Sequence, residues 1–169
     1  MGLVELLIAM TVLAVALLAL VAAFSSGALT LQRAGQTSTA SALANQQMEL
    51  YRGLKYCSIR LDDGSLPAPT PYASDPAYSA SQVLDTADCD GTVPTCSAVA
   101  WPDPCNASQL ISGSDTPDGR SYRVDSYIIH DTPPGGRELK QVTIVVRNGN
   151  DVTGPALVRT SSKFDEISG

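Results

Sequence analysis

The chain has 169 residues, which is long enough for one domain with its own hydrophobic core. Its 17 acidic residues outnumber its 11 lysines and arginines, and the formal net charge is −6. This balance excludes an extended basic surface, so we expect no direct nucleic-acid binding.

The first 24 residues form the most apolar segment. Every residue from Leu6 to Phe24 is apolar except Thr11. A helix over residues 1–24 would be about 36 Å long at ~1.5 Å per residue, which is sufficient to span a bilayer. A secretory signal peptide fits less well, because no basic residue precedes the apolar run and the first one in the sequence is Arg33. The segment is therefore predicted to be a transmembrane helix.

The helix is predicted to continue well beyond the apolar segment. All 11 prolines lie between Pro67 and Pro155, so no residue before Pro67 forbids a helix. We expect one helix from about Leu3 to Leu54.

Residues 25–56 are predicted to be the amphipathic half of this helix. Helix propensity is low at Gly35 and at Ser25, Ser26 and Gly27, where we expect flexible points. Beyond them, apolar residues fall close to one helix face, which must pack on another element. These residues are Ala40, Leu43, Leu50 and Leu54.

Residues 57–119 contain few periodic apolar positions and are predicted to be an irregular, disulfide-bearing loop region. All four cysteines lie there, and an even number outside a membrane segment is typical of disulfides in an oxidising compartment. We expect two disulfides and favour Cys89–Cys96 with Cys57–Cys105, which close one short and one long loop. The other two pairings stay open, and reduced, buried thiols are the alternative.

Residues 120–169 have the alternating pattern of an antiparallel sheet. Apolar residues recur at every second position in parts of 121–129 and 139–147, as in strands with one buried face. A third strand is expected at 156–161. The intervening turn signals are Pro133-Pro134-Gly135-Gly136 and Asn148-Gly149. The predicted fold class is therefore α+β, with the amphipathic half of a long N-terminal helix packed on a C-terminal antiparallel sheet.

One carboxylate lies in the apolar segment, at Glu5. A charge within a membrane costs about 2.5–3.5 kcal/mol on insertion scales, so such residues are usually paired or functional. No basic residue lies within helical reach, and the only nearby cation is the α-amino group of Met1. In a staggered bundle of helices, Glu5 of one chain would neutralise the amine of its neighbour. The alternative is that Glu5 lies near enough to the membrane surface to reach water.

The ten residues MGLVELLIAM, from Met1 to Met10, resemble the N-terminus of bacterial type IV pilins and type II secretion pseudopilins. Leu3, Glu5, Leu6 and Leu7 match the best-known positions of that family. The layout of long helix, variable loop and antiparallel sheet is also similar, which implies a pilin-like fold.

The resemblance implies that a prepilin peptidase removes a basic leader, that Met1 is N-methylated and that Glu5 docks the subunit into a filament. It also implies residence in the bacterial inner membrane before assembly and in an extracellular pilus afterwards. The implied partners are further copies of the chain, the peptidase and the pilus assembly machinery. The family often has a proline where this chain has Ala22, so Ser25, Ser26 and Gly27 are the candidate flexible point here.

Other groups of residues give weaker predictions. Asp85, Asp88 and Asp90 supply the oxygen ligands that calcium prefers, but their spacing is not a calcium-loop motif, and solvated turn residues are the alternative. His130 is the only histidine, so catalytic triads and histidine zinc sites would all depend on it. We expect no enzymatic activity, no cofactor and no metal.

The functional hypothesis is a structural subunit, a major or minor pilin, of a type IV pilus-like filament. A pseudopilin of a type II secretion or DNA-uptake system is an alternative from the same family. A single-pass membrane-anchored binding protein is the alternative from a different class, with the helix serving only as a tether. Replacement of Glu5 distinguishes the filament subunit from the tether.

Overall fold

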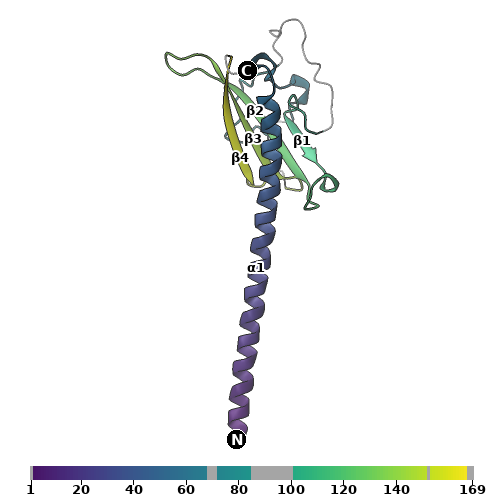
Figure 1. Ribbon diagram of the computed structural model, residues 1–169, viewed down its shortest axis with the longest axis vertical. Helices are drawn as coiled ribbons and strands as arrows, with labels where there is room; N and C mark the ends of the chain where they lie inside the picture. The colour runs from purple at the N-terminus through teal and green to yellow at the C-terminus, as the bar shows by residue number, and fades with distance from the viewer. Residues whose placement is uncertain (1, 68–71, 85–100, 152, 167–169) are drawn as a thin grey trace. The chain divides into compact units, whose positions relative to one another are not determined.

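The computed structural model describes residues 2–67, 72–84, 101–151 and 153–166 (Figure 1). The chain divides into two compact units, residues 1–36 and 37–169. One helix, α1 (Leu3–Arg52), begins in the first unit and ends in the second. The fold class is α+β, as predicted, with a long N-terminal helix and a four-stranded antiparallel sheet.

Helix α1 is unbroken from Leu3 to Arg52. Polar side chains along it bond to its own backbone: the hydroxyl groups of Thr11, Ser25 and Thr30 donate to carbonyl oxygens three or four residues earlier. The backbone is helical through Ser25, Ser26 and Gly27, so their role as a flexible point stays a prediction. The helix ends two residues before the predicted Leu54.

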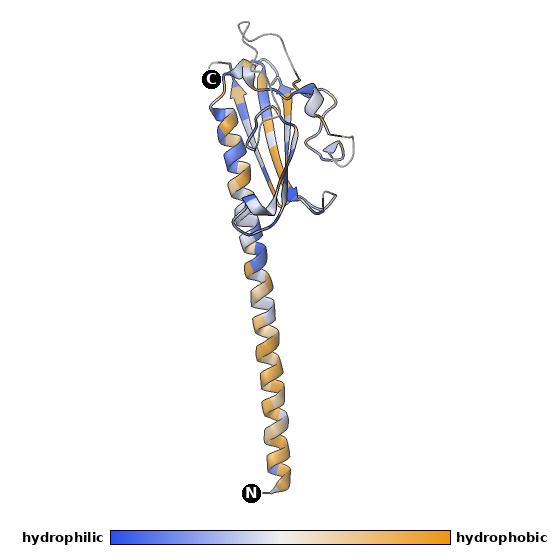
Figure 2. Ribbon diagram, turned by 90° about the vertical axis from the view of Figure 1, so that its right-hand side faces the viewer, coloured by the Kyte–Doolittle hydropathy of each residue, from blue (hydrophilic) through white to orange (hydrophobic). Residues whose placement is uncertain are grey.

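The second half of α1 carries a buried face, as its amphipathic pattern predicts. Ala40 and Leu43 are buried, whereas Leu50 and Leu54 are half-buried. Figure 2 shows mainly apolar residues along the first half of the helix and polar residues interspersed with them in the second. The buried positions recur at helical spacing and are Ala40, Leu43, Ala44, Gln47, Met48 and Tyr51.

The sheet has the strand order β1-β2-β3-β4, and all neighbouring strands are antiparallel. Strands β2, β3 and β4 lie near the three predicted strands, whereas β1 falls in the segment expected to be irregular. The strands are β1 (Ser108–Ile111), β2 (Tyr122–Asp131), β3 (Leu139–Asn148) and β4 (Val158–Asp165).

The two faces of the sheet have different partners within residues 37–169. Val124 pairs with Val146 and Ile128 with Val142, so their side chains share one face, which we call the inner face. Inner-face residues belong to the same buried cluster as the second half of α1. Each fully buried Val or Ile side chain contributes roughly 1.5–3 kcal/mol to the free energy of unfolding. The opposite, outer face carries Arg123, Asp125 and their neighbours at alternate positions.

Short segments complete this unit around the sheet. Leu61 pairs with Leu84, and Gln82 pairs with Ile129, each in an isolated bridge. Cys57 and Cys105 are disulfide-bonded, and neither is a free thiol. Cys89 and Cys96 lie outside the described residues, so the pairing of the four cysteines stays a prediction.

Candidate functional site

The first 30 or so residues of α1 present an apolar surface with no cover. All side chains described from Gly2 to Gly35 are exposed, and the large apolar ones among them have exposed fractions between 54% and 77%. The helix is long and apolar enough to cross a membrane. A large exposed apolar surface is typical of a site that contacts a membrane or other protein.

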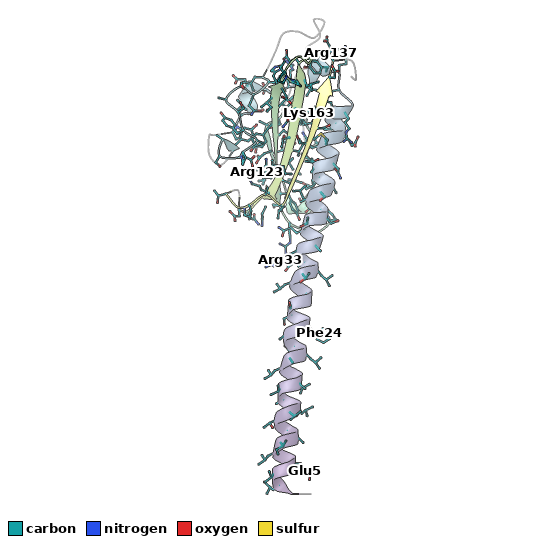
Figure 3. The ribbon with its side chains drawn as sticks, turned by 90° about the vertical axis from the view of Figure 1, so that its left-hand side faces the viewer. Glu5, Phe24, Arg33, Arg123, Arg137 and Lys163 are labelled. Carbon is teal, nitrogen blue, oxygen red and sulfur yellow. The ribbon has the colours of Figure 1, made fainter. Side chains whose placement is uncertain are left out.

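Glu5 lies in the first turn of α1, at the N-terminal end of this surface (Figure 3). A carboxylate at a helix N-terminus is favoured by the helix dipole, but its negative charge still needs a partner within a membrane. Among the described residues the carboxylate has no hydrogen-bond or ion-pair partner. Met1 lies outside those residues, so the predicted pair between Glu5 and the amine stays a prediction.

Three hydroxyl groups along this surface donate hydrogen bonds within the helix. Thr11 donates to Ile8, Ser25 to Val21 and Thr30 to Ser26, all within the helix. Each of these hydroxyl groups uses its one O–H donor within its own helix and keeps only acceptor capacity for a neighbouring helix. Glu5 differs from the polar residues of the segment 3–30 in its charge, because it is the one charged residue there.

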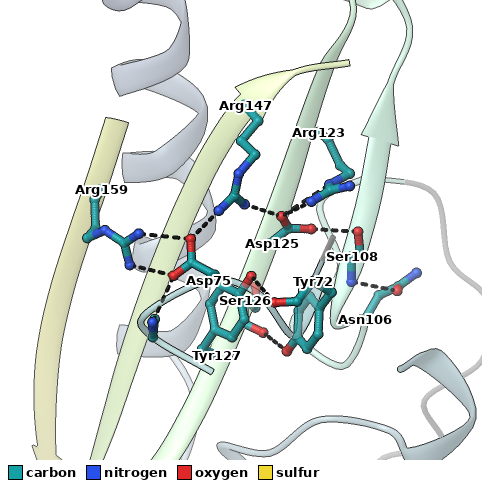
Figure 4. Close-up of polar contacts among 11 residues, drawn as sticks. Tyr72, Asp75, Asn106, Ser108, Arg123, Asp125, Ser126, Tyr127, Arg147 and Arg159 are labelled. Atoms are coloured by element: carbon teal, nitrogen blue, oxygen red, sulfur yellow. Dashed lines mark hydrogen bonds and ion pairs between the residues drawn. The ribbon is translucent and has the colours of Figure 1, made fainter. Parts of the chain in front are cut away.

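A second polar cluster, absent from the sequence predictions, lies on the outer face of the sheet. Arg123, Asp125, Arg147, Asp75 and Arg159 form an alternating chain of charges across β2, β3 and β4, which we call the arginine–aspartate chain (Figure 4). The strand register places its arginines and Asp125 on one face, since Arg123 pairs with Arg147 and Val145 pairs with both Asp125 and Arg159.

The geometry of the arginine–aspartate chain is that of charge-assisted hydrogen bonds. Asp125 Oδ2 accepts from Arg123 Nη2 at 2.7 Å and from Arg147 Nη1 at 2.6 Å. Arg147 also donates to Asp75. Asp75 accepts two parallel bonds from Arg159, each 2.8 Å long. Ser108 Oγ donates to the second oxygen of Asp125 at 2.6 Å.

These contacts shift the pKa values of two members of the arginine–aspartate chain. Burial acts to raise the pKa of Asp75, but hydrogen bonds from Arg159 and the Ala77 backbone, together with the charge of Arg147, outweigh it and leave the pKa below its ordinary value. For Arg147, burial acts to lower the pKa, but the charges of Asp125 and Asp75 raise it above its ordinary value. Both groups are therefore ionised at neutral pH.

Two stacked tyrosines bind the same segment to the sheet. The rings of Tyr72 and Tyr127 have centroids 4.4 Å apart, and the Tyr72 hydroxyl donates to the Ser126 carbonyl at 2.6 Å. Burial is the main cause that raises the pKa of both phenols. Together with Asp75, these contacts hold residues 72–75 against the outer face.

Only part of this cluster is signalled by the residue pattern. Arg123 and Asp125 are opposite charges two residues apart in a strand, which places them on one face. Nothing in the local pattern connects Asp75 with Arg147, 72 residues away in the chain. The strand alternation predicted the faces, but not that a loop would cover the polar one.

The remaining predicted residues do not gather into a site. Asp85, Asp88 and Asp90 lie outside the described residues. His130 is at the end of β2, where its Nδ1 contacts Glu138 across the β2–β3 hairpin. Within the described residues, no group of three or more acidic, histidine or cysteine side chains is arranged to hold a metal ion.

Comparison with known proteins gives no relative: no family model, curated protein or solved structure matches the chain. The resemblance to pilins therefore depends on the N-terminal residues and on the layout of the elements.

Proposed function

We propose that this chain is a structural subunit of a type IV pilus-like filament, anchored in a membrane before assembly. The observation that carries the proposal is the exposed apolar surface of α1 with Glu5 as its one acidic residue. The α+β fold is consistent with a pilin, and the N-terminal residues resemble that family.

The apolar surface suits two environments in turn. Exposed Leu, Val and Ile side chains surround the first half of α1 instead of forming one stripe, as expected of a helix that is covered on all sides. Lipid provides this cover before assembly, and helices of other subunits provide it in the filament core. In both cases the helix satisfies its own backbone hydrogen bonds.

Glu5 gives the assembly its axial register. A bundle held only by apolar contacts can slide, because such contacts have no direction. Pairing of Glu5 with the Met1 amine of a neighbouring subunit fixes one stagger, since any other stagger leaves both charges buried and unpaired. The proposal thus requires residue 1 to carry a free or N-methylated amine in the assembled subunit.

The test is replacement of Glu5 by Gln, which preserves the shape of the side chain and removes its charge. We expect E5Q subunits to insert in the membrane but to be absent from sheared filaments, as measured by immunoblotting of both fractions. Thr11→Val is the matched control, because Thr11 is the nearest polar residue and its hydroxyl bonds within its own helix. T11V should assemble as the unchanged chain does.

Normal filament incorporation of E5Q would overturn the proposed pairing and favour a membrane-anchored binding protein. Mass spectrometry of the filament protein provides an independent check. It should find a chain that begins at Met1 with a methylated amine; a longer N-terminus in assembled subunits would contradict the mechanism.

A further inference from the structure

A small open pocket lies at the end of the arginine–aspartate chain. Its volume is about 240 Å³, and its walls come from the segment 74–76, from Arg147 and Arg159, and from the loop 153–156 that precedes β4. Nothing in the proposed filament function uses this pocket.

The pocket presents positive charge in preference to negative charge. The arginine–aspartate chain contains three arginines and two aspartates, so it holds one positive charge in excess. The side chain of Asp75 is 1% exposed, whereas that of Arg159 is 39% exposed. A molecule entering the pocket therefore meets the guanidinium group of Arg159, while the carboxylate of Asp75 is covered.

Arg159 retains donors for such a molecule. A guanidinium group has five N–H donors in a planar fork. The described contacts use Nη1 and Nη2 of Arg159 for one bond each, both to Asp75. Asp75 thereby fixes the plane of the guanidinium group, which reduces the entropy lost when a second acceptor binds.

Asp151 is the nearest other carboxylate on the adjoining loop. It accepts a hydrogen bond from the Thr153 hydroxyl at 3.1 Å, does not line the pocket and is exposed, so solvent screens its charge. Its screened charge lowers the positive potential of the pocket.

We propose that this pocket binds a carboxylate monoanion through Arg159. One negative charge compensates the single excess positive charge, and the planar carboxylate matches the guanidinium fork. The source of the carboxylate is either a free small acid or an acidic side chain of a protein, and the two share the same recognition chemistry.

The experiment is an NMR titration of the full chain in detergent micelles, following the Arg159 side-chain Nε–H and the Gly154 amide. Acetate and N-acetyl-aspartyl amide are the probes, and the uncharged isosteres acetamide and N-acetyl-asparaginyl amide are their controls. We expect saturable shifts with at least one carboxylate and none with the amides. Binding of acetate alone identifies a free acid as the source, and binding of the aspartyl probe identifies a protein side chain.

Two variants locate the binding. R159Q should weaken it by about tenfold or more, as expected for loss of a charge-assisted bond. Ala156→Leu fills an exposed position of the pocket wall without changing any charge and should also weaken binding. The matched control is R137Q, because Arg137 is an exposed arginine 4.0 Å from Asp165, at the far end of β4 from Arg159; R137Q should bind as the unchanged chain does.

Three results would overturn the proposal: no saturable shift with either carboxylate, equal shifts with the amides, or unchanged binding by A156L. A156L keeps the test decisive if R159Q loses its fold, since it leaves the arginine–aspartate chain intact.

Discussion

Asp75 shows how one residue can fix the position of a whole segment. Its carboxylate accepts from Arg147, Arg159 and the Ala77 amide, and it is almost fully buried. A buried charge is tolerated only when its partners compensate the cost of leaving water. With two arginines and an amide as partners, Asp75 stabilises the position of its segment on the outer face.

We expect Asp75→Asn to lower the free energy of unfolding of the unit 37–169 by about 3 kcal/mol at pH 7. This value is at the lower end of the range for breaking a buried ion pair, because Arg159 is partly solvated after the change. Thermal unfolding of the full chain in detergent, followed by the β-sheet circular dichroism signal, measures the effect. Asp115→Asn removes an exposed carboxylate and should change the stability by less than about 0.5 kcal/mol.

The destabilisation by D75N should depend on pH with a definite sign. The pKa of Asp75 in the folded state lies below its ordinary value, so its contribution is fully present above the unfolded pKa of about 3.9. The contribution is lost as pH falls through the lower, folded pKa. The stability difference between the unchanged chain and D75N should therefore be constant from pH 5 to 7 and decrease below about pH 4. A difference that decreases between pH 7 and 5 would contradict this assignment.

At the scale of elements, α1 has one chemical character before residue 36 and another after it. Met10 is 61% exposed, whereas Met48 is 2% exposed in the core formed with the sheet. The same residue type therefore occupies two environments on one helix.

This contrast gives a matched pair of substitutions. Met48→Ala should destabilise the residues 37–169 by about 2–5 kcal/mol, because it removes buried atoms and leaves a cavity. Met10→Ala should leave the unfolding temperature of the sheet unchanged, since Met10 belongs to the other unit. Circular dichroism of both variants in detergent measures the difference, and equal effects would show that the two units do not unfold separately.

The sequence predicted those elements whose pattern is local. Ala40 and Leu43 show the period of a helix face, and Val142, Ile144 and Val146 show the period of a strand, so both buried surfaces could be recognised. Strand β1 could not, because its four residues are too few to display a clear alternation. The contacts of Asp75 with Arg147 and Arg159 escaped prediction because they join residues that lie 72 and 84 positions apart in the chain.

At the scale of the whole molecule, the chain combines a unit that needs cover with one that has its own core. Residues 37–169 contain the entire buried cluster, which includes Tyr51. Burial raises the pKa of the Tyr51 phenol to about 12. Residues 3–36 contribute no side chain to that cluster.

A chain that lacks residues 1–36 should therefore fold and be soluble without detergent. Its own core and the disulfide-bonded cysteines remain, while the exposed apolar surface is removed. Size-exclusion chromatography and circular dichroism should show a monodisperse β-containing species. Aggregation with loss of the β signal would mean that the apolar segment is needed for folding as well as for anchoring.

The self-bonded hydroxyl groups of α1 have a consequence for how the helix tolerates change. Thr11, Ser25 and Thr30 use their O–H donors within α1, so in this arrangement they donate no hydrogen bond to a neighbouring helix. Under the proposed assembly, the charge of Glu5 is what selects one axial stagger of the subunits. The apolar residues around Glu5 are then interchangeable: leucine, valine and isoleucine can replace one another along the segment while the filament keeps its pitch.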